Sequence, residues 1–81
     1  MTLGNEFAES ESVRKTIRNE IYRYLHFHRD QQITVHTITG AFRGVYKSSS
    51  IVKGLYQLQD EGIIELPEGA HSEGPVILLG S

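Results

Sequence analysis

The stretch TVHTITGAFRGVYKSSSIVKGLYQLQDEGIIEL, residues 34–66, decides the fold of this 81-residue chain. Apolar residues recur with helical spacing in two runs, 35–42 and 48–61, and the segment RGVY lies between them. Gly44 in this segment suits the positive φ of a turn, and Gly62 suits the end of the second helix. The pattern predicts two helices joined by a turn, with a strand directly after Gly62.

The apolar spacing also predicts which side of each helix is buried. The inward residues are expected to be Val35, Ile38, Phe42, Ile51, Leu55 and Leu58. Thr34 suits the N-cap of the first helix, and Lys47 or one of the serines 48–50 suits that of the second. Ala41 has a small side chain, so we expect another helix to cross closely at that position.

A longer helix is predicted upstream, ending near residues 29–32. Its apolar stripe consists of Val13, Ile17, Ile21, Tyr24, Leu25 and His28. Ser12 is a suitable N-cap, with Ser10 as the alternative. We expect residues 1–11 to form an acidic, mobile N-terminal tail and residues 12–81 to form one domain.

The remaining segments predict strands. Ile33 is an isolated β-branched residue that suits a very short strand, and residues 63–66 and 76–79 suit two more. The segment PEGAHSEGP, residues 67–75, holds both prolines and two glycines and suits a loop. The order of elements predicts an α+β fold, with a three-helix core and a C-terminal two-stranded β-hairpin.

The composition excludes several classes of protein. There is no cysteine, which excludes disulfides and thiolate metal sites. No apolar run approaches the roughly 20 residues that a membrane-spanning helix needs. The first residues are acidic and lack the pattern of a secretory signal, so we expect a cytoplasmic protein without a membrane partner.

Charge is distributed unevenly along the chain, although the net charge is only −2. All eight Lys and Arg residues lie within residues 13–59, together with two acidic residues. The other eight acidic residues lie in 1–12 and 60–81. A basic central block between acidic ends favours an anionic partner for the central block.

The stretch 34–66 resembles the helix-turn-helix of winged-helix transcription regulators. The likeness is strongest in LYQLQDEGIIEL, residues 55–66, which matches the closing run of the family, and it extends over residues 13–79. It implies a winged helix-turn-helix fold whose C-terminal hairpin is the wing. It also implies sequence-specific binding of double-stranded DNA by a small transcriptional regulator, with helix 48–61 in the major groove.

The resemblance and the side-chain chemistry together select the DNA-binding candidates. They are Thr34, His36, Arg43, Lys47, Ser48, Ser49, Ser50, Val52, Lys53 and Gln57. Thr34, His36 and Arg43 would contact phosphates, and residues 47–50 would position the start of the helix. Val52, Lys53 and Gln57 would face bases.

Two departures from the family predict few phosphate contacts. Helix 48–61 has no arginine, and the wing carries Glu68 and Glu73 without Lys or Arg. We therefore expect a homodimer on paired half-sites, because a monomer would bind weakly. The candidate dimer residues are Tyr22, Arg18, Leu3 and Phe7. The acidic tail could pair with the face around Tyr22, within one subunit or across two.

Tyr56 resembles a tyrosine in the recognition helix of Z-DNA-binding winged-helix domains. The asparagine that those domains carry four residues earlier is Val52 here, and the aromatic residue of their wing strand is missing. We therefore expect Tyr56 to pack at the junction of the helix and the wing.

No pattern for catalysis or metal binding is present. The four histidines have no ligand-like spacing, and no Gly-rich phosphate loop or nucleophile with its base is recognisable. We expect no enzyme activity, no cofactor, no metal and no small-molecule substrate. The alternative function is a protein–protein interaction module in a larger phage, plasmid or secretion-type assembly, which would expose an apolar patch.

Overall fold

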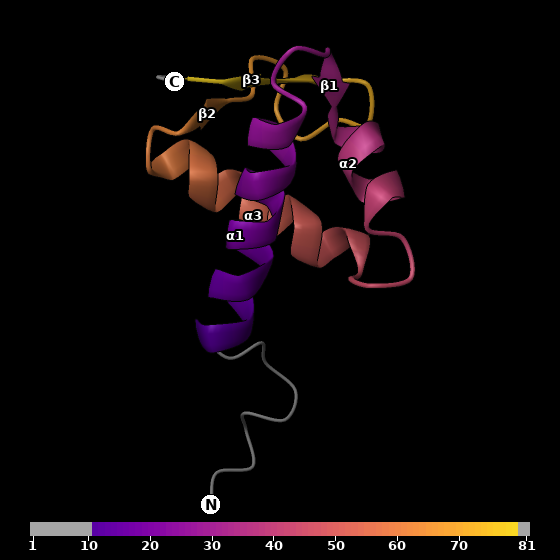
Figure 1. The fold of residues 1–81 in the computed structure, drawn as a ribbon, viewed down its shortest axis with the longest axis vertical. Coiled ribbons are helices and arrows are strands. Elements are labelled where there is room, and N and C mark those ends of the chain that lie inside the picture. The colour runs from indigo at the N-terminus through magenta and orange to yellow at the C-terminus, as the bar shows by residue number, and fades with distance from the viewer. Residues whose placement is uncertain (1–10, 80–81) are drawn as a thin grey trace, which may run out of the picture.

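The computed structural model describes residues 11–79, which form three helices and a three-stranded antiparallel sheet (Figure 1). The elements are α1 (Glu11–Phe27), β1 (Ile33–Thr34), α2 (Val35–Ala41), α3 (Ser48–Asp60), β2 (Ile64–Glu65) and β3 (Pro75–Leu78). The predicted α+β class and order of elements are confirmed. The predictions for Leu3, Phe7 and Ser10 lie outside the described residues.

The helix α1 packs against α3 through three of its predicted inward residues. Ile17, Ile21 and Leu25 are buried, whereas Val13 is 44% exposed. The expectation for Val13 was wrong because the first turns of α1 extend beyond the other elements (Figure 1). The helix also ends earlier than predicted, at Phe27, and Ser12 lies inside it and is not its N-cap.

The helices α1 and α3 cross closely at Gly54. The expectation of a close crossing at Ala41 was wrong, because Ala41 is exposed. A Cβ atom at Gly54 would lie 2.8 Å from Cδ1 of Ile21 and 3.5 Å from Cγ2 of Ile17. Real Cβ atoms essentially never lie as close as the first distance. Glycine is therefore what allows the two helices to approach.

The start of α2 is closed by a capping box and by the loop after β2. The Thr34 hydroxyl accepts a hydrogen bond from the Thr37 N–H (3.1 Å), as predicted for an N-cap. The N–H groups of Val35 and His36 donate to the carbonyls of Gly74 (3.1 Å) and Ser72 (2.8 Å). The loop 66–74 is thereby fixed against the first turn of α2.

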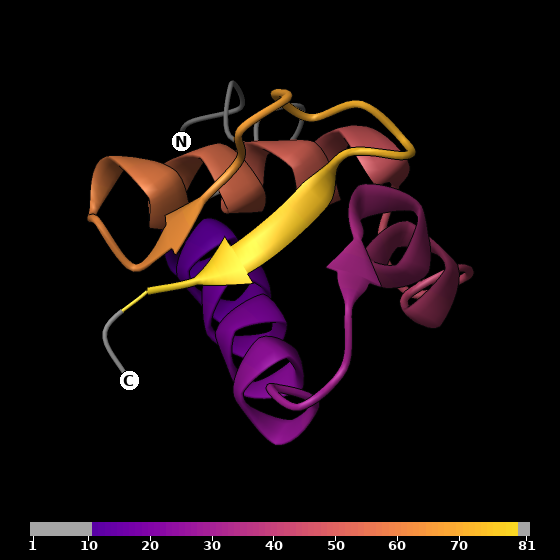
Figure 2. The same cartoon turned by 90° about the horizontal axis from the view of Figure 1, so that it is seen from above.

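The sheet has the order β1-β3-β2, so the predicted two-stranded hairpin has gained a third strand (Figure 2). Ile33 pairs with Val76 on one side of β3, and Ile64 pairs with Leu78 on the other. The short β1 covers the edge of β3 that a hairpin alone would leave open. Val76 points into the core and its neighbour Ile77 points out, as expected from strand alternation.

Candidate nucleic-acid interface

The outward face of α3 follows from the side that it buries. Ile51, Leu55 and Leu58 are fully buried, as predicted. The exposed residues are Ser48, Ser49, Lys53, Tyr56, Gln57 and Asp60. No acidic residue precedes Asp60 in the helix, so the first three turns present only hydroxyl, ammonium, phenol and amide groups.

The N-terminus of α3 is open, in contrast to that of α2. Lys47 is its N-cap, as one of the predicted alternatives, and it makes no side-chain capping hydrogen bond. The first bonds to its carbonyl come from the N–H groups of Ser50 (3.0 Å) and Ile51 (3.1 Å). The N–H groups of Ser48 and Ser49 precede these bonds and lie on exposed residues. An exposed helix start of this kind is electropositive and offers donors to an anion.

Two of the predicted DNA contacts need correction. Ser50 is only 9% exposed, because it lies on the inner side of α3 against α1, so its hydroxyl does not belong to the exposed face. The hydroxyl of Thr34 is engaged in the capping box, and the loop 66–74 occupies the first N–H groups of α2. Of the two residues predicted at the start of α2, only the His36 side chain is exposed.

The other predicted residues reach the surface to different degrees. Arg43 and Lys47 lie exposed in the connection from α2 to α3, where Gly44 has the predicted positive φ of 85°. Lys53 and Gln57 are exposed on α3, and Val52 is half-buried beside them.

Arg14 is a basic neighbour of this surface that the sequence pattern did not identify. A narrow hollow between α1 and α3 is lined by Arg14, Ile17, Ser50, Lys53, Gly54 and Gln57. Helical spacing places Arg14 beside Ile17 on the inward edge of α1, three residues earlier. That signal was present in the sequence, but only the crossing at Gly54 shows that this edge borders Lys53.

Tyr56 is also a member of the exposed face, and the expectation that it packs at a junction with the C-terminal strands was wrong. It is 44% exposed, three residues after Lys53. Gln59 joins α3 to the segment after β2, because its side-chain oxygen accepts a hydrogen bond from the Leu66 N–H (2.9 Å). Tyr56 is therefore free to contact a ligand of α3.

The C-terminal end of α3 is tied to α1 by an ion pair. The Arg18 side chain donates from Nε to both carboxylate oxygens of Glu61 (3.0 and 3.3 Å), and Nη2 donates to Oε1 as well. The Gln57 amide donates to the same carboxylate (3.2 Å). Glu61 thus occupies Arg18 within one subunit, and the predicted pairing of the acidic tail with this face lies outside the described residues.

The predicted dimer residues of α1 are used inside the subunit. Arg18 is engaged by Glu61. Tyr22 is half-buried against the core and contacts the His26 ring edge-on, with 5.6 Å between ring centroids. Neither side chain is the free anchor that a dimer contact on this face would need.

The ion pair predicts a small acid-dependent contribution to stability. Hydrogen bonds from Arg18, and more weakly from Gln57, lower the pKa of Glu61 below its ordinary value of 4.5. Because the pKa of Glu61 is lower in the folded state, its ionised carboxylate stabilises the fold above pH 4.5. This contribution is lost as the pH falls below 4.5 and through the lower folded-state pKa. Because the pair is solvent-screened, Glu61→Gln should lower the free energy of unfolding at pH 7 by less than about 1 kcal/mol.

Urea unfolding between pH 7 and pH 3 measures this effect. The difference between the wild type and Glu61→Gln should shrink on acidification, whereas Glu65→Gln on β2 provides a control at an exposed carboxylate. A difference that stays constant with pH would contradict the role of the ion pair.

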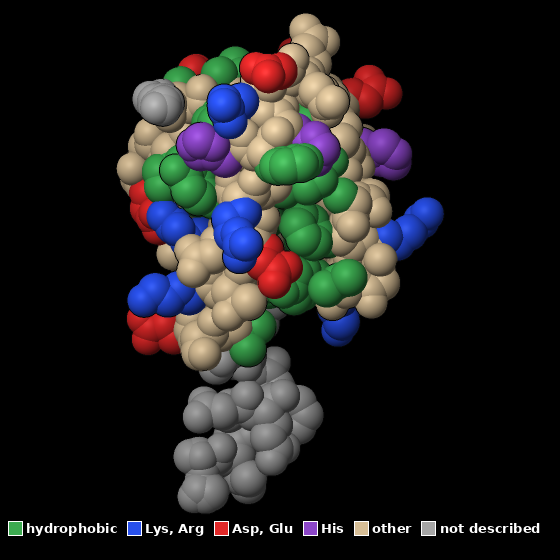
Figure 3. Space-filling model, viewed as in Figure 1, with side chains coloured by type: hydrophobic (Ala, Val, Ile, Leu, Met, Phe, Trp, Pro, Cys, Tyr) green, Lys and Arg blue, Asp and Glu red, His purple; other side chains and the backbone are tan. Residues whose placement is uncertain are grey.

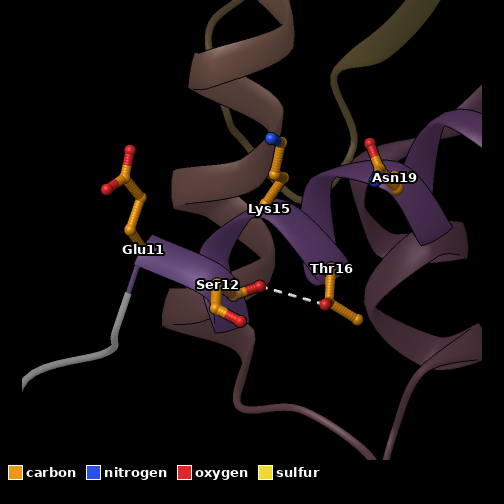
Figure 4. A pocket seen from close by; sticks show the side chains of 5 residues that line it. All are labelled: Glu11, Ser12, Lys15, Thr16 and Asn19. Carbon is orange, nitrogen blue, oxygen red and sulfur yellow. Dashed lines mark hydrogen bonds between the residues drawn. The ribbon is translucent and has the colours of Figure 1, made fainter.

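The start of α1 forms part of the open surface of the molecule. A hollow there is lined by Glu11, Ser12, Lys15, Thr16 and Asn19, all from α1 itself (Figure 4). Thr16 only donates to the Ser12 carbonyl (3.0 Å). Because one helix alone supplies the lining, the hollow is open surface.

Metal sites and membrane-spanning helices are both absent from residues 11–79. These residues contain no group of three or more His, Asp or Glu side chains placed to hold a metal ion. None of their helices combines the length and the apolar composition that crossing a membrane requires.

Comparison of the chain with protein-family models, curated proteins and solved structures finds no match.

Proposed function

We propose that this chain is a small winged helix-turn-helix protein that binds double-stranded DNA and regulates transcription. The helices α2 and α3 would form the helix-turn-helix, and β2, β3 and the loop between them would form the wing. One observation carries the proposal: the open, acid-free N-terminus of α3, with Lys47 and Lys53 beside it. Such a helix suits a negatively charged groove lined by phosphates and base edges.

The exposed residues of α3 would have different roles in the groove. The N–H groups and hydroxyls of Ser48 and Ser49 would contact phosphate, and Lys53 would add positive charge. Gln57 keeps its carbonyl oxygen and one amide hydrogen available beside its bond to Glu61, which suits an adenine edge. Tyr56, whose phenol can donate a hydrogen bond, would extend the contact along the same face.

The acidic residues limit the affinity that we expect. Arg18 neutralises Glu61 at the far end of α3, which reduces repulsion of DNA there. Glu68 and Glu73 remain exposed in the loop after β2, so this loop is a poor ligand for phosphate. Binding should therefore rest on a few cations and weaken steeply with salt.

Fluorescence anisotropy with a random-sequence duplex, at about 50 and then about 200 mM salt, tests the proposal. Wild-type binding should fall steeply between these concentrations. Lys53→Ala and Arg14→Ala should each weaken binding and lower the salt slope by about 0.9, the value for one phosphate contact. The matched control is Lys15→Ala, which should keep the wild-type salt slope. Lys15 is next to Arg14 in the chain but does not line the hollow that contains Lys53.

Two outcomes would contradict the proposal. The first is the absence of any binding at the lower salt concentration by a protein whose circular dichroism shows it to be folded. The second is a wild-type salt slope in Lys53→Ala.

One observation favours the second candidate function, a protein–protein interaction module. Phe27 is 82% exposed, beside half-buried Tyr24 and Phe42. An exposed aromatic group of this kind is typical of a protein contact. If the folded chain does not bind DNA, this function becomes the better proposal, and a pull-down with immobilised protein would be the next experiment.

A further inference from the structure

An aromatic surface lies where α1 meets α2, and we define it by Tyr24, Phe27 and Phe42. The rings of Tyr24 and Phe42 are 5.8 Å apart between centroids. With Glu20 and Arg23 they line an open hollow of about 390 Å³. Figure 3 shows hydrophobic side chains gathered on this face of the molecule. Since one water occupies about 30 Å³, the hollow has room for an aromatic side chain.

The rings of this surface are held in place by their neighbours. Tyr24 packs on His28, with 4.4 Å between centroids, and Phe42 packs on Tyr46, at 5.9 Å. Phe27 touches His28 edge-on at 5.0 Å and otherwise extends into solvent. The surface therefore combines a fixed aromatic floor with one protruding ring, and little side-chain freedom would be lost on binding.

The rim of the aromatic surface carries one acidic and one basic residue. Glu20 is half-buried and interacts with the Tyr46 hydroxyl, and Arg23 is exposed. The ion pair found among residues 11–79 is the one between Arg18 and Glu61, so Glu20 and Arg23 are not paired within the subunit. A half-buried carboxylate and an exposed guanidinium on one rim make the surface complementary in charge to a copy of itself.

We propose that the aromatic surface is the interface of a two-fold symmetric homodimer. In a two-fold interface, a contact between a first residue of one copy and a second residue of the other is repeated with the two copies exchanged, so each off-axis contact is made twice. Phe27 of each copy enters the hollow of the other, and Arg23 of each copy faces Glu20 of the other. This interface replaces the predicted one at Tyr22 and Arg18. The surface contains no residue of α3, so the exposed residues of α3 are not part of the interface.

Sedimentation velocity tests the interface with the full chain in the absence of DNA. Protein concentrations from about 1 to about 100 μM cover the dissociation constants expected for a protein contact of modest affinity. The wild type should dimerise within this range. Phe27→Asp should raise the dissociation constant at least about 30-fold, as expected for the central anchor of an interface. Leu79→Asp, at an apolar residue that is 40% exposed but outside the surface, should leave it unchanged.

A charge exchange tests the two-fold geometry separately. Glu20→Arg and Arg23→Glu should each weaken self-association, because each places like charges opposite one another. An equimolar mixture of the two variants should form a heterodimer that is tighter than either homodimer, since both rim contacts are then between opposite charges. Circular dichroism confirms that each variant is folded.

Three results would overturn the dimer proposal. The first is a wild type that stays monomeric at the highest concentration, and the second is a Phe27→Asp variant that dimerises like the wild type. The third is a mixture of Glu20→Arg and Arg23→Glu whose heterodimer is no tighter than either homodimer. The first would leave the surface open to a different protein. Because DNA is absent from these experiments, their outcome is independent of the proposed DNA binding.

Discussion

Replacing Gly54 with leucine should lower the free energy of unfolding by about 3 kcal/mol, the upper part of the range for overpacked cores. Any Cβ at this position lies 2.8 Å from Cδ1 of Ile21, so the end of this fully buried side chain must shift. The backbone of α1 at Arg18 is also near, at 3.9 Å, so a larger side chain must push the two helices apart. For a chain of this size, this loss is a large part of the total stability.

Gly40→Leu is the matched control for the Gly54 prediction. Gly40 lies in α2 and is exposed, and a Cβ atom added there would have no neighbour within 4 Å. The same substitution there should be neutral or stabilise the chain by up to about 1 kcal/mol, because leucine forms helices better than glycine. Urea unfolding followed by circular dichroism compares the two variants. Equal stabilities would show that the crossing of α1 and α3 is looser than the distances indicate.

Leu55→Ala should lower the free energy of unfolding by about 2–5 kcal/mol, the range for loss of a large buried aliphatic side chain. Leu55 is fully buried in the core cluster that joins α1, α3 and the sheet. Its removal leaves a cavity that the surrounding core cannot fill completely. Thermal and urea unfolding measure the change.

The adjacent Tyr56→Ala is the control for Leu55→Ala and separates the core from the candidate site. Because Tyr56 is exposed, its loss should cost less than about 1 kcal/mol of stability. It should nevertheless weaken any DNA binding by α3 at unchanged melting temperature. A loss of several kcal/mol would contradict the exposed position of Tyr56.

Much of the local structure follows directly from the sequence. The inward residues Ile51, Leu55 and Leu58 are those that helical spacing predicts. Gly44 and Gly62 take positive φ values of 85° and 78°, and Thr34 caps α2. These features depend on residues within one or two turns of each other, and such residues interact in much the same way in any fold.

The candidate site was predictable only in part. The exposed positions Ser48, Ser49, Lys53 and Gln57 follow from the buried stripe of α3, because the outward residues of a helix are the complement of the inward ones. The same argument misplaced Ser50, which lies on the border of the stripe and is covered by α1. It could not reveal Arg14, which comes from another helix.

By itself, the sequence determined the α+β class, the order of the elements, the Thr34 cap of α2, the turns at Gly44 and Gly62, and the buried side of α3. Only the tertiary structure decided that α1 crosses α3 at Gly54, that Gln59 bonds to Leu66 while Tyr56 stays exposed, and that Arg18 pairs with Glu61. The periodicity of a helix identifies its inward side but contains no information about the element that packs there. That information lies in contacts between residues far apart in the chain, such as Arg18 and Glu61, and these form only when the helices pack together.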